Sequence, residues 1–144
     1  MEVNFFSVIE LIQLVCRSMM RQRKGSIINI GSIAAWGEDT SQMEYAASKA
    51  ALTIATKKLA RELGAIGIRV NAVAPGLTKT KMLEELEEEQ LQTITKGIGL
   101  HRLGTPEEIA QVCLWLASDS SSFVTGETIK ADGGGFDLRL STSK

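Results

Sequence analysis

Two short apolar runs separated by an alanine-rich segment limit most strongly what this chain can fold into. Residues 26–30 (SIINI) and 68–74 (IRVNAVA) are rich in β-branched side chains and apolar on both faces, which is typical of buried parallel strands. The segment between them predicts a helix over residues 43–63 that ends at Gly64, and its many alanines let a second helix approach closely. This order of strand, helix and strand predicts a βαβ unit with a right-handed crossover.

The first segment of the chain predicts an apolar helix that needs cover on two sides. It spans residues 3–23, with Gly25 as the residue just after its end. One side can pack on the sheet, and the other needs a partner chain or a further part of the domain. Its polar interruptions are Asn4, Ser7, Glu10, Gln13 and Arg17. They predict neither a signal peptide nor a membrane-spanning helix.

The second part of the chain extends the βαβ unit. It predicts an acidic amphipathic helix at 83–92, a helix capped by Thr105, and a last strand at 127–131. The predicted fold is α/β, a partial Rossmann-type doubly wound sheet of three parallel strands with flanking helices. A complete dinucleotide-binding sheet has two βαβαβ halves, and 144 residues leave room for one. We therefore expect a single partial domain over 1–144 with a polar tail at 135–144.

Composition excludes several classes of function. The formal net charge is −1, so no basic surplus exists for a nucleic-acid footprint. Cys16 and Cys113 lie far apart among aliphatic residues without other ligands at metal-binding spacing. We expect no metal site. We expect both thiols to lie in the core of a cytoplasmic protein.

A tyrosine and a lysine stand where acid–base chemistry is feasible. Tyr45 and Lys49 are four residues apart on the predicted helix, so their side chains share one face. A fixed ammonium favours the ionised form of a neighbouring phenol, which suits proton transfer near neutral pH. The pair alone equally fits a tyrosine at a helix start beside a solvated lysine. The position of the pair in the predicted fold favours the acid–base interpretation. Ser32 and Pro75-Gly76 follow the two strands at the sheet edge where α/β proteins bind ligands.

Further short motifs continue this pattern along the chain. They are Gly31-Ser32, Tyr45-Ala-Ala-Ser-Lys49, Arg69-Val-Asn-Ala-Val-Ala-Pro75-Gly76 with Thr80, Arg102-Leu-Gly-Thr-Pro-Glu-Glu-Ile109, Thr125-Gly-Glu-Thr and Asp132-Gly-Gly134. In this order and spacing they resemble the second half of a short-chain dehydrogenase/reductase. Within that family the chain is most similar to the group of 3-oxoacyl-carrier-protein reductases and hydroxysteroid or sugar-alcohol dehydrogenases.

The resemblance implies catalytic roles for four residues. Tyr45 would exchange a proton with the substrate oxygen, and Lys49 would favour the phenolate and hold the nicotinamide ribose. Ser32 would hydrogen-bond the substrate oxygen, and Asn4 would support a water in the proton relay. The alternatives are an N-cap role for Asn4 and an ordinary loop hydroxyl for Ser32.

The resemblance also implies cofactor contacts. Pro75-Gly76, with the backbone near Thr78, would seat the nicotinamide carboxamide, and Thr80 would face the phosphates. Residues 81–100 would form a substrate lid, with Trp36 lining the pocket. A simple turn at Pro75-Gly76 and a loop hydroxyl at Thr80 are the alternatives.

The sequence departs from the family at several points. No set of glycines fits G-x-x-x-G-x-G or G-x-G-x-x-G, and the part that reads the adenosine ribose has no counterpart. His101 stands where the family has a small residue, and we expect it on the lid or the surface. The cofactor, NAD or NADP, is thus expected to bind weakly or not at all to this chain alone, and the choice between them is open.

Two functions follow as hypotheses. The chain is an NAD(P)-dependent oxidoreductase acting on a small carbonyl or alcohol, inactive in isolation, or a catalytically silent half-domain that assembles with other chains. The expected partners are further copies, through residues 3–23 and 43–63, or a polypeptide that supplies the first half. We expect an isolated fragment, a natural truncation, or one member of such a pair.

Overall fold

A three-stranded parallel sheet forms the centre of the molecule. The computed structural model describes residues 1–37, 41–80 and 87–135. Its strands are β1 (Gly25–Ile30), β2 (Ile68–Pro75) and β3 (Thr128–Ala131), in the order β1-β2-β3. Both pairings are parallel, with Gly25 beside Ile68 and Ala72 beside Thr128. The predicted α/β class and the predicted strands are confirmed.

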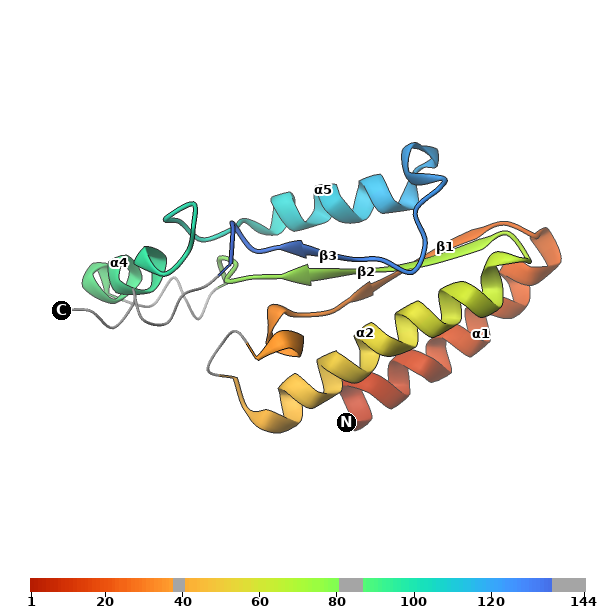
Figure 1. Ribbon diagram of the computed structural model, residues 1–144, viewed down its shortest axis with the longest axis horizontal. Helices are drawn as coiled ribbons and strands as arrows, with labels where there is room; N and C mark the ends of the chain where they lie inside the picture. The colour runs from red at the N-terminus through yellow and green to blue at the C-terminus, as the bar shows by residue number, and fades with distance from the viewer. Residues whose placement is uncertain (38–40, 81–86, 136–144) are drawn as a thin grey trace.

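Helices cover both faces of this sheet (Figure 1). On one face lie η1 (Glu2–Phe6), continued by α1 (Ser7–Gln22), and α2 (Met43–Gly64), and on the other face lies α5 (Pro106–Ala117). The shorter helices are η2 (Ile33–Trp36), α4 (Glu88–Lys96) and η3 (Asp119–Ser121).

The core between the sheet and the first two helices is aliphatic. Ile12 and Cys16 of α1 pack with Ile27 of β1, Ala60 of α2 and Val70 of β2. The side of α2 that is buried carries Ser48, Leu52, Thr56 and Ala60, so only one of its alanines is fully buried, and the helix packs mainly on β2. Burial raises the pKa of the Cys16 thiol, which keeps it protonated in this environment.

The end of α1 differs from the prediction. Gly25 was expected just after the helix in the left-handed conformation, but Arg23 occupies that conformation with φ 51°. Gly25 instead begins β1, where an added Cβ would lie 2.6 Å from Sδ of Met19. The close approach of the Met19 side chain, and not a backbone angle, therefore favours glycine here.

The acidic helix also differs from the prediction. It was expected over 83–92, but α4 begins after Glu87 and runs to Lys96, while residues 81–86 lie outside the described residues. Glu87 is held as N-cap by a reciprocal pair of bonds with Gln90. The helix α4 therefore starts where a capping box forms.

The start of α5 is as predicted. The Thr105 hydroxyl accepts a bond from Glu108 N at 3.2 Å, and the Glu108 carboxylate accepts one from Thr105 N at 2.9 Å. Arg102 adds two bonds to the same carboxylate, at 2.7 and 2.9 Å. These bonds hold the pKa of Glu108 at about 2, mainly through the Arg102 guanidinium and then through the backbone of Thr105.

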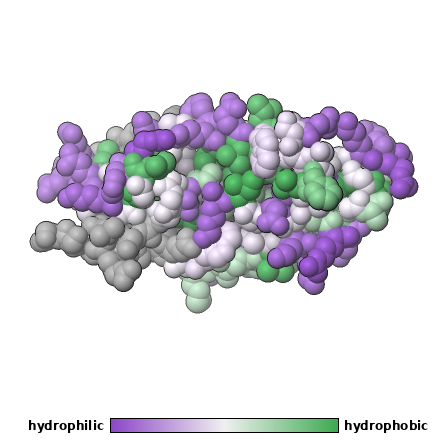
Figure 2. All heavy atoms as spheres, turned by 45° about the horizontal axis from the view of Figure 1, so that its top comes forward, coloured by the Kyte–Doolittle hydropathy of each residue, from purple (hydrophilic) through white to green (hydrophobic). Residues whose placement is uncertain are grey.

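Large apolar side chains remain exposed on both helical layers. On α1 Leu14 is 66% exposed, and on α5 Leu114 is 61% exposed. Figure 2, with the α5 side turned forward, shows apolar residues between hydrophilic ends of the molecule. The helical stretch Glu2–Gln22 is long and apolar enough to cross a membrane by length and composition, which is weak support for a span because core helices pass the same test.

Two glycines at the end of α2 give a matched test of backbone strain. Gly67 has φ +85°, and an added Cβ there would collide with the Arg23 carbonyl oxygen, whereas a Cβ at Gly64 meets nothing within 4 Å. We expect Gly67→Ala to lower the free energy of unfolding by at least about 1–2 kcal/mol. Gly64→Ala should raise it by about 0.5–1 kcal/mol, because alanine favours the helix. Urea unfolding measures the free energy of unfolding of both variants. An equal change in the two variants would contradict the predicted strain at Gly67.

Glu108 gives a test of pH dependence. Its pKa lies at about 2, below the ordinary 4.5, so its ionised form stabilises the fold above about pH 4.5 and this contribution is lost as the pH falls towards 2. Glu108→Gln should lower the melting temperature at pH 7 and flatten its fall between pH 4.5 and 2. Glu107→Gln removes a charge from the same turn without breaking the Arg102–Glu108 pair. The melting temperature of this variant should fall between pH 4.5 and 2 as steeply as that of the unmodified chain. Thermal unfolding followed by circular dichroism at a series of pH values separates the two variants.

Candidate active site

Tyr45 and Lys49 lie together on the first turns of α2, as their spacing predicts. The Lys49 Nζ lies 5.7 Å from the centroid of the Tyr45 ring. Tyr45 is 37% exposed, so its ring is open to solvent while it contacts the lysine. A cation at this distance from an aromatic ring is attracted to it. The pair therefore combines an accessible phenol with a fixed positive charge.

The lysine has a second partner that the sequence did not predict. Its Nζ donates a hydrogen bond of 2.9 Å to the carbonyl oxygen of Ile30, the last residue of β1. Burial lowers the pKa of Lys49 because the ammonium loses solvent. The carbonyl is a main-chain group on a distant segment, so no side-chain motif indicates it.

Ser32 begins the loop after β1 and caps η2. Its Oγ accepts a hydrogen bond of 3.1 Å from the N–H of Ala34. This bond uses an oxygen lone pair and not the hydroxyl proton, so the hydroxyl keeps its capacity to donate. The helix η2 packs against α2, which carries Tyr45. The loop role and the predicted substrate contact are thus compatible.

Asn4 lies within η1, and not at its N-cap, which is Met1. The N-cap interpretation of Asn4 is therefore wrong. Asn4 and Lys49 line the same cavity of about 390 Å³, beside β1 and between α1 and α2. The structure thus brings three predicted residues, Asn4, Lys49 and Tyr45, to one side of the sheet.

The predicted cofactor residues lie along the next strand. Pro75 ends β2 beside Ala131, and a Cβ on Gly76 would lie 2.7 Å from Cα of Asp132. The Thr78 hydroxyl donates to the Gly76 carbonyl at 3.1 Å, and Thr80 is exposed. The turn is thus a tight junction with the loop after β3 and more than a simple reversal.

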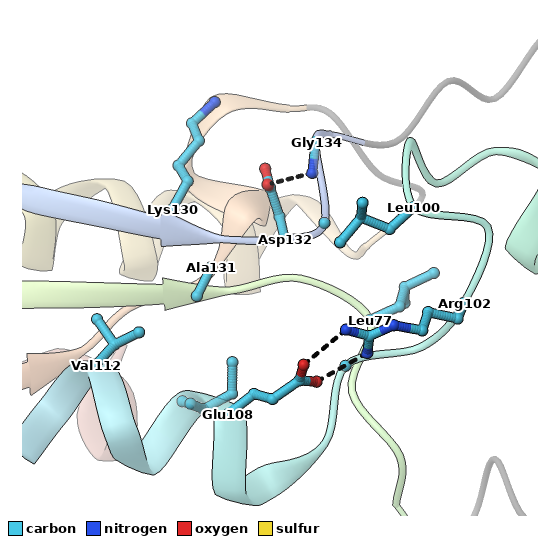
Figure 3. Close-up of a pocket in the computed structure, with 12 residues that line it drawn as sticks. Leu77, Leu100, Arg102, Glu108, Val112, Lys130, Ala131, Asp132 and Gly134 are labelled. Atoms are coloured by element: carbon cyan, nitrogen blue, oxygen red, sulfur yellow. Dashed lines mark hydrogen bonds and ion pairs between the residues drawn. The ribbon is translucent and has the colours of Figure 1, made fainter.

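A second cavity of about 390 Å³ opens next to this junction (Figure 3). Leu77 and Leu100 supply apolar wall, the Arg102–Glu108 pair lies on the α5 side, and Asp132 lies on the β3 side. The part of the predicted lid that the structure describes, residues 87–100, contains α4 and leads into this cavity.

Two further residues named from the sequence, Trp36 and His101, are both exposed. Trp36, expected to line the pocket, is exposed and has Lys130 Nζ 4.5 Å above its ring, which joins the Ser32 loop to β3. His101 is on the surface, as expected, and has φ 53°. Within residues 1–37, 41–80 and 87–135, no three histidines, cysteines or acidic residues group as a metal site would need.

Comparisons with known proteins bear on the family of the chain. The enoyl-(acyl carrier protein) reductase family profile matches residues 1–135. The chain is 48% identical over 132 residues to a 3-oxoacyl-[acyl-carrier-protein] reductase of Thermotoga maritima, covering 92% of this chain and 54% of the relative. A relative with the same name from Vibrio cholerae is 41% identical over 134 residues, which cover 93% of this chain and 55% of the relative.

Solved structures are similar as well. The crystal structure of a 3-oxoacyl-[acyl-carrier protein] reductase from Brucella melitensis superimposes with a TM-score of 0.84 at 41% identity, covering 91% of this chain and 49% of that one. The chain spans about half the length of the curated relatives it matches. Family profile, sequence identity and fold agree, and the chain belongs to the short-chain dehydrogenase/reductase family.

Proposed function

We propose that this chain carries the acid–base part of a nicotinamide-dependent oxidoreductase that interconverts a carbonyl and an alcohol. The observation that carries this proposal is the contact of Lys49 Nζ with the accessible Tyr45 ring, 5.7 Å away, in a member of this family. Ser32, at the carboxyl end of β1, supplies a hydroxyl near the same helix. A phenol, an ammonium and a hydroxyl are the groups that such a reaction needs.

The residues present fit one end of the cofactor. The ammonium of Lys49 and the hydroxyl of Tyr45 suit the ribose hydroxyls next to a nicotinamide. No glycine-rich turn between a strand and a helix exists in the sequence to hold a pyrophosphate. We therefore propose that NAD or NADP binds to an assembly that includes a second, phosphate-binding part.

The roles of the residues follow from their chemistry. A nicotinamide held by Lys49 and Tyr45 would supply or accept the hydride at the substrate carbon. In the reductive direction Tyr45 donates its phenolic proton to the substrate oxygen, and Lys49 stabilises the phenolate that remains. Ser32 donates a hydrogen bond to the same oxygen and so stabilises its developing negative charge.

The relatives support a class of substrate. Because relatives named 3-oxoacyl-[acyl-carrier-protein] reductase are 41–48% identical to this chain, we propose a 3-oxoacyl thioester as the substrate.

The two cysteines, Cys16 and Cys113, are both unpaired, which supports a reducing, cytoplasmic location.

The acid–base role of Tyr45 can be tested in an assembled enzyme. The chain is co-expressed with the part of the Thermotoga maritima reductase outside the matched segment, and NAD(P)H absorbance is followed with acetoacetyl coenzyme A. Tyr45→Phe should lower kcat by about 10²–10⁴-fold, because the proton donor is lost. Glu44→Gln changes the exposed neighbouring residue and should keep the rate. Activity that survives Tyr45→Phe would remove the proposed role.

A second candidate function is assembly with further copies of the chain. It is supported by the apolar surface that α1 leaves uncovered, with Leu14 66% exposed on a 16-residue helix. We propose that α1 and α2 meet the same helices of a second copy, because the apolar stripe of one helix is buried best against another.

This association predicts a difference between two leucines. Leu14→Glu on α1 should shift the chain towards monomer, because it would bury a charge in the interface. Leu114→Glu on α5 is matched in type and exposure and should leave the association unchanged. Sedimentation equilibrium at micromolar concentration measures both, and a strictly monomeric unmodified chain would contradict the proposal.

A further inference from the structure

The indole of Trp36 lies against the ammonium of Lys130. The distance from Lys130 Nζ to the ring centroid is 4.5 Å. Tryptophan is the aromatic side chain that attracts a cation most strongly, and the attraction acts within about 6 Å of the centroid. Both residues are exposed, so the contact lies on the surface of the molecule. It joins two segments that are far apart in the sequence.

The Trp36–Lys130 contact spans the middle strand of the sheet. Trp36 ends η2, which follows β1, and Lys130 belongs to β3. The strands β1 and β3 pair with opposite edges of β2, and Lys130 stands beside Ala74 near the carboxyl end of β2. Figure 3 shows the Lys130 side chain on the side of β3 away from Val112 of α5. The contact therefore links the loop after β1 to β3 across the end of β2.

The turn η2 is held in shape by local hydrogen bonds. Three amides in and next to η2 donate within the turn at 3.0–3.1 Å, and we call them the η2 amides: Ala34, Ala35 and Gly37. These bonds fix the shape of the turn but not its place relative to β2 and β3. Ile33 and Ala34 are buried and anchor the start of the turn. The contact with Lys130 anchors its end.

The place of this turn determines the direction of the Ser32 hydroxyl. Ser32 is the N-cap of η2, and its Oγ accepts a hydrogen bond of 3.1 Å from the N–H of Ala34. When the turn moves, this N–H moves, and the Ser32 side chain rotates with it. A contact that fixes the far end of the turn at Trp36 therefore also fixes the hydroxyl at its start.

We propose that Lys130 is a positioning residue, whose ammonium holds the Trp36 indole across β2 and thereby keeps the Ser32 hydroxyl directed at the substrate oxygen. The proposal rests on the function proposed above for Ser32. The competing account is that Trp36 contacts the substrate directly and that its contact with Lys130 has no effect on the reaction.

Hydrogen exchange in the chain alone tests whether the contact holds the turn. Lys130→Met keeps most of the aliphatic stem and removes the cation. We expect the η2 amides to exchange about two- to fivefold faster in this variant, as for the loss of one exposed cation–π contact. Lys130→Arg keeps a cation and should keep the slower exchange. Lys57→Met removes a charge from an exposed site on α2 and should leave the η2 amides unchanged.

A double-mutant cycle assigns the effect to the pair. Trp36→Leu should speed the exchange of the η2 amides as Lys130→Met does, and the two changes together should have no larger effect than either alone. Trp115→Leu is a matched control, because Trp115 is 41% exposed and Trp36 is 42% exposed. The amide of Ala72, which donates to Glu127 O in the centre of the sheet, should keep its exchange rate in every variant and so report an intact fold.

Kinetics of the assembled enzyme described above test the link to Ser32. Lys130→Met should lower kcat about two- to fivefold and leave KM unchanged, because the Ser32 hydrogen bond strengthens as charge develops on the substrate oxygen. In a Ser32→Ala background the same change should have no further effect on kcat. A contact with a merely structural role would lower kcat equally in both backgrounds.

Several results would overturn the proposal. They are unchanged exchange of the η2 amides in Lys130→Met, equally fast exchange in Lys57→Met, and additive effects of Lys130→Met and Trp36→Leu. A raised KM in Trp36→Leu with an unchanged kcat in Lys130→Met would also overturn it and would support direct contact of Trp36 with the substrate.

The proposal and the proposed function fail in different ways. Faster exchange of the η2 amides in Lys130→Met, with an assembly that has no reductase activity, would support the hold on the turn and contradict the oxidoreductase. An active assembly whose Lys130→Met variant keeps its kcat would support the oxidoreductase and contradict the positioning of Ser32 by Lys130.

Discussion

The central strand β2 is the constraint on which the rest of the structure depends. Val70 to Ala74 are buried without interruption, because helices cover both faces of β2 and strands pair with both of its edges. Its polar side chains also connect distant segments. Arg69 donates to the carbonyls of Leu116, Ser118 and Val124, and the Asn71 amide bonds Val124 O and Glu127 N. The end of α5 and the entry to β3 are therefore fixed by the strand that also fixes β1.

This arrangement determines where chemistry can occur. Parallel pairing aligns the carboxyl ends of β1 and β2, so the loops that contain Ser32 and Gly76 leave the sheet at one edge. Lys49 reaches this edge from α2 and contacts both a phenol and a backbone carbonyl. One side chain therefore links the acid–base pair to the carboxyl end of β1.

The parts of the fold set by local physics were predictable from the sequence. The strands follow from β-branched runs, the shared face of Tyr45 and Lys49 from helical spacing, and the start of α5 from the cap at Thr105. Contacts between distant segments were not predictable. The Lys49 bond to Ile30 involves a backbone group, and the preference for glycine at position 25 comes from the Met19 side chain that packs above it. The start of α4 at Glu88 was missed because the capping box there uses Glu87 and Gln90, within a uniformly acidic run that hides the boundary.

The two edges of the described sheet are not equivalent. β3 has four residues and β1 has six, so β1 offers the longer row of backbone groups to an added strand. Beside β1 the cavity wall is aliphatic, from α1, whereas the cavity near the end of β3 has the Arg102–Glu108 pair at its side. The apolar cavity therefore lies beside the strand end that Lys49 contacts, and the charged cavity lies beside the turn at Gly76.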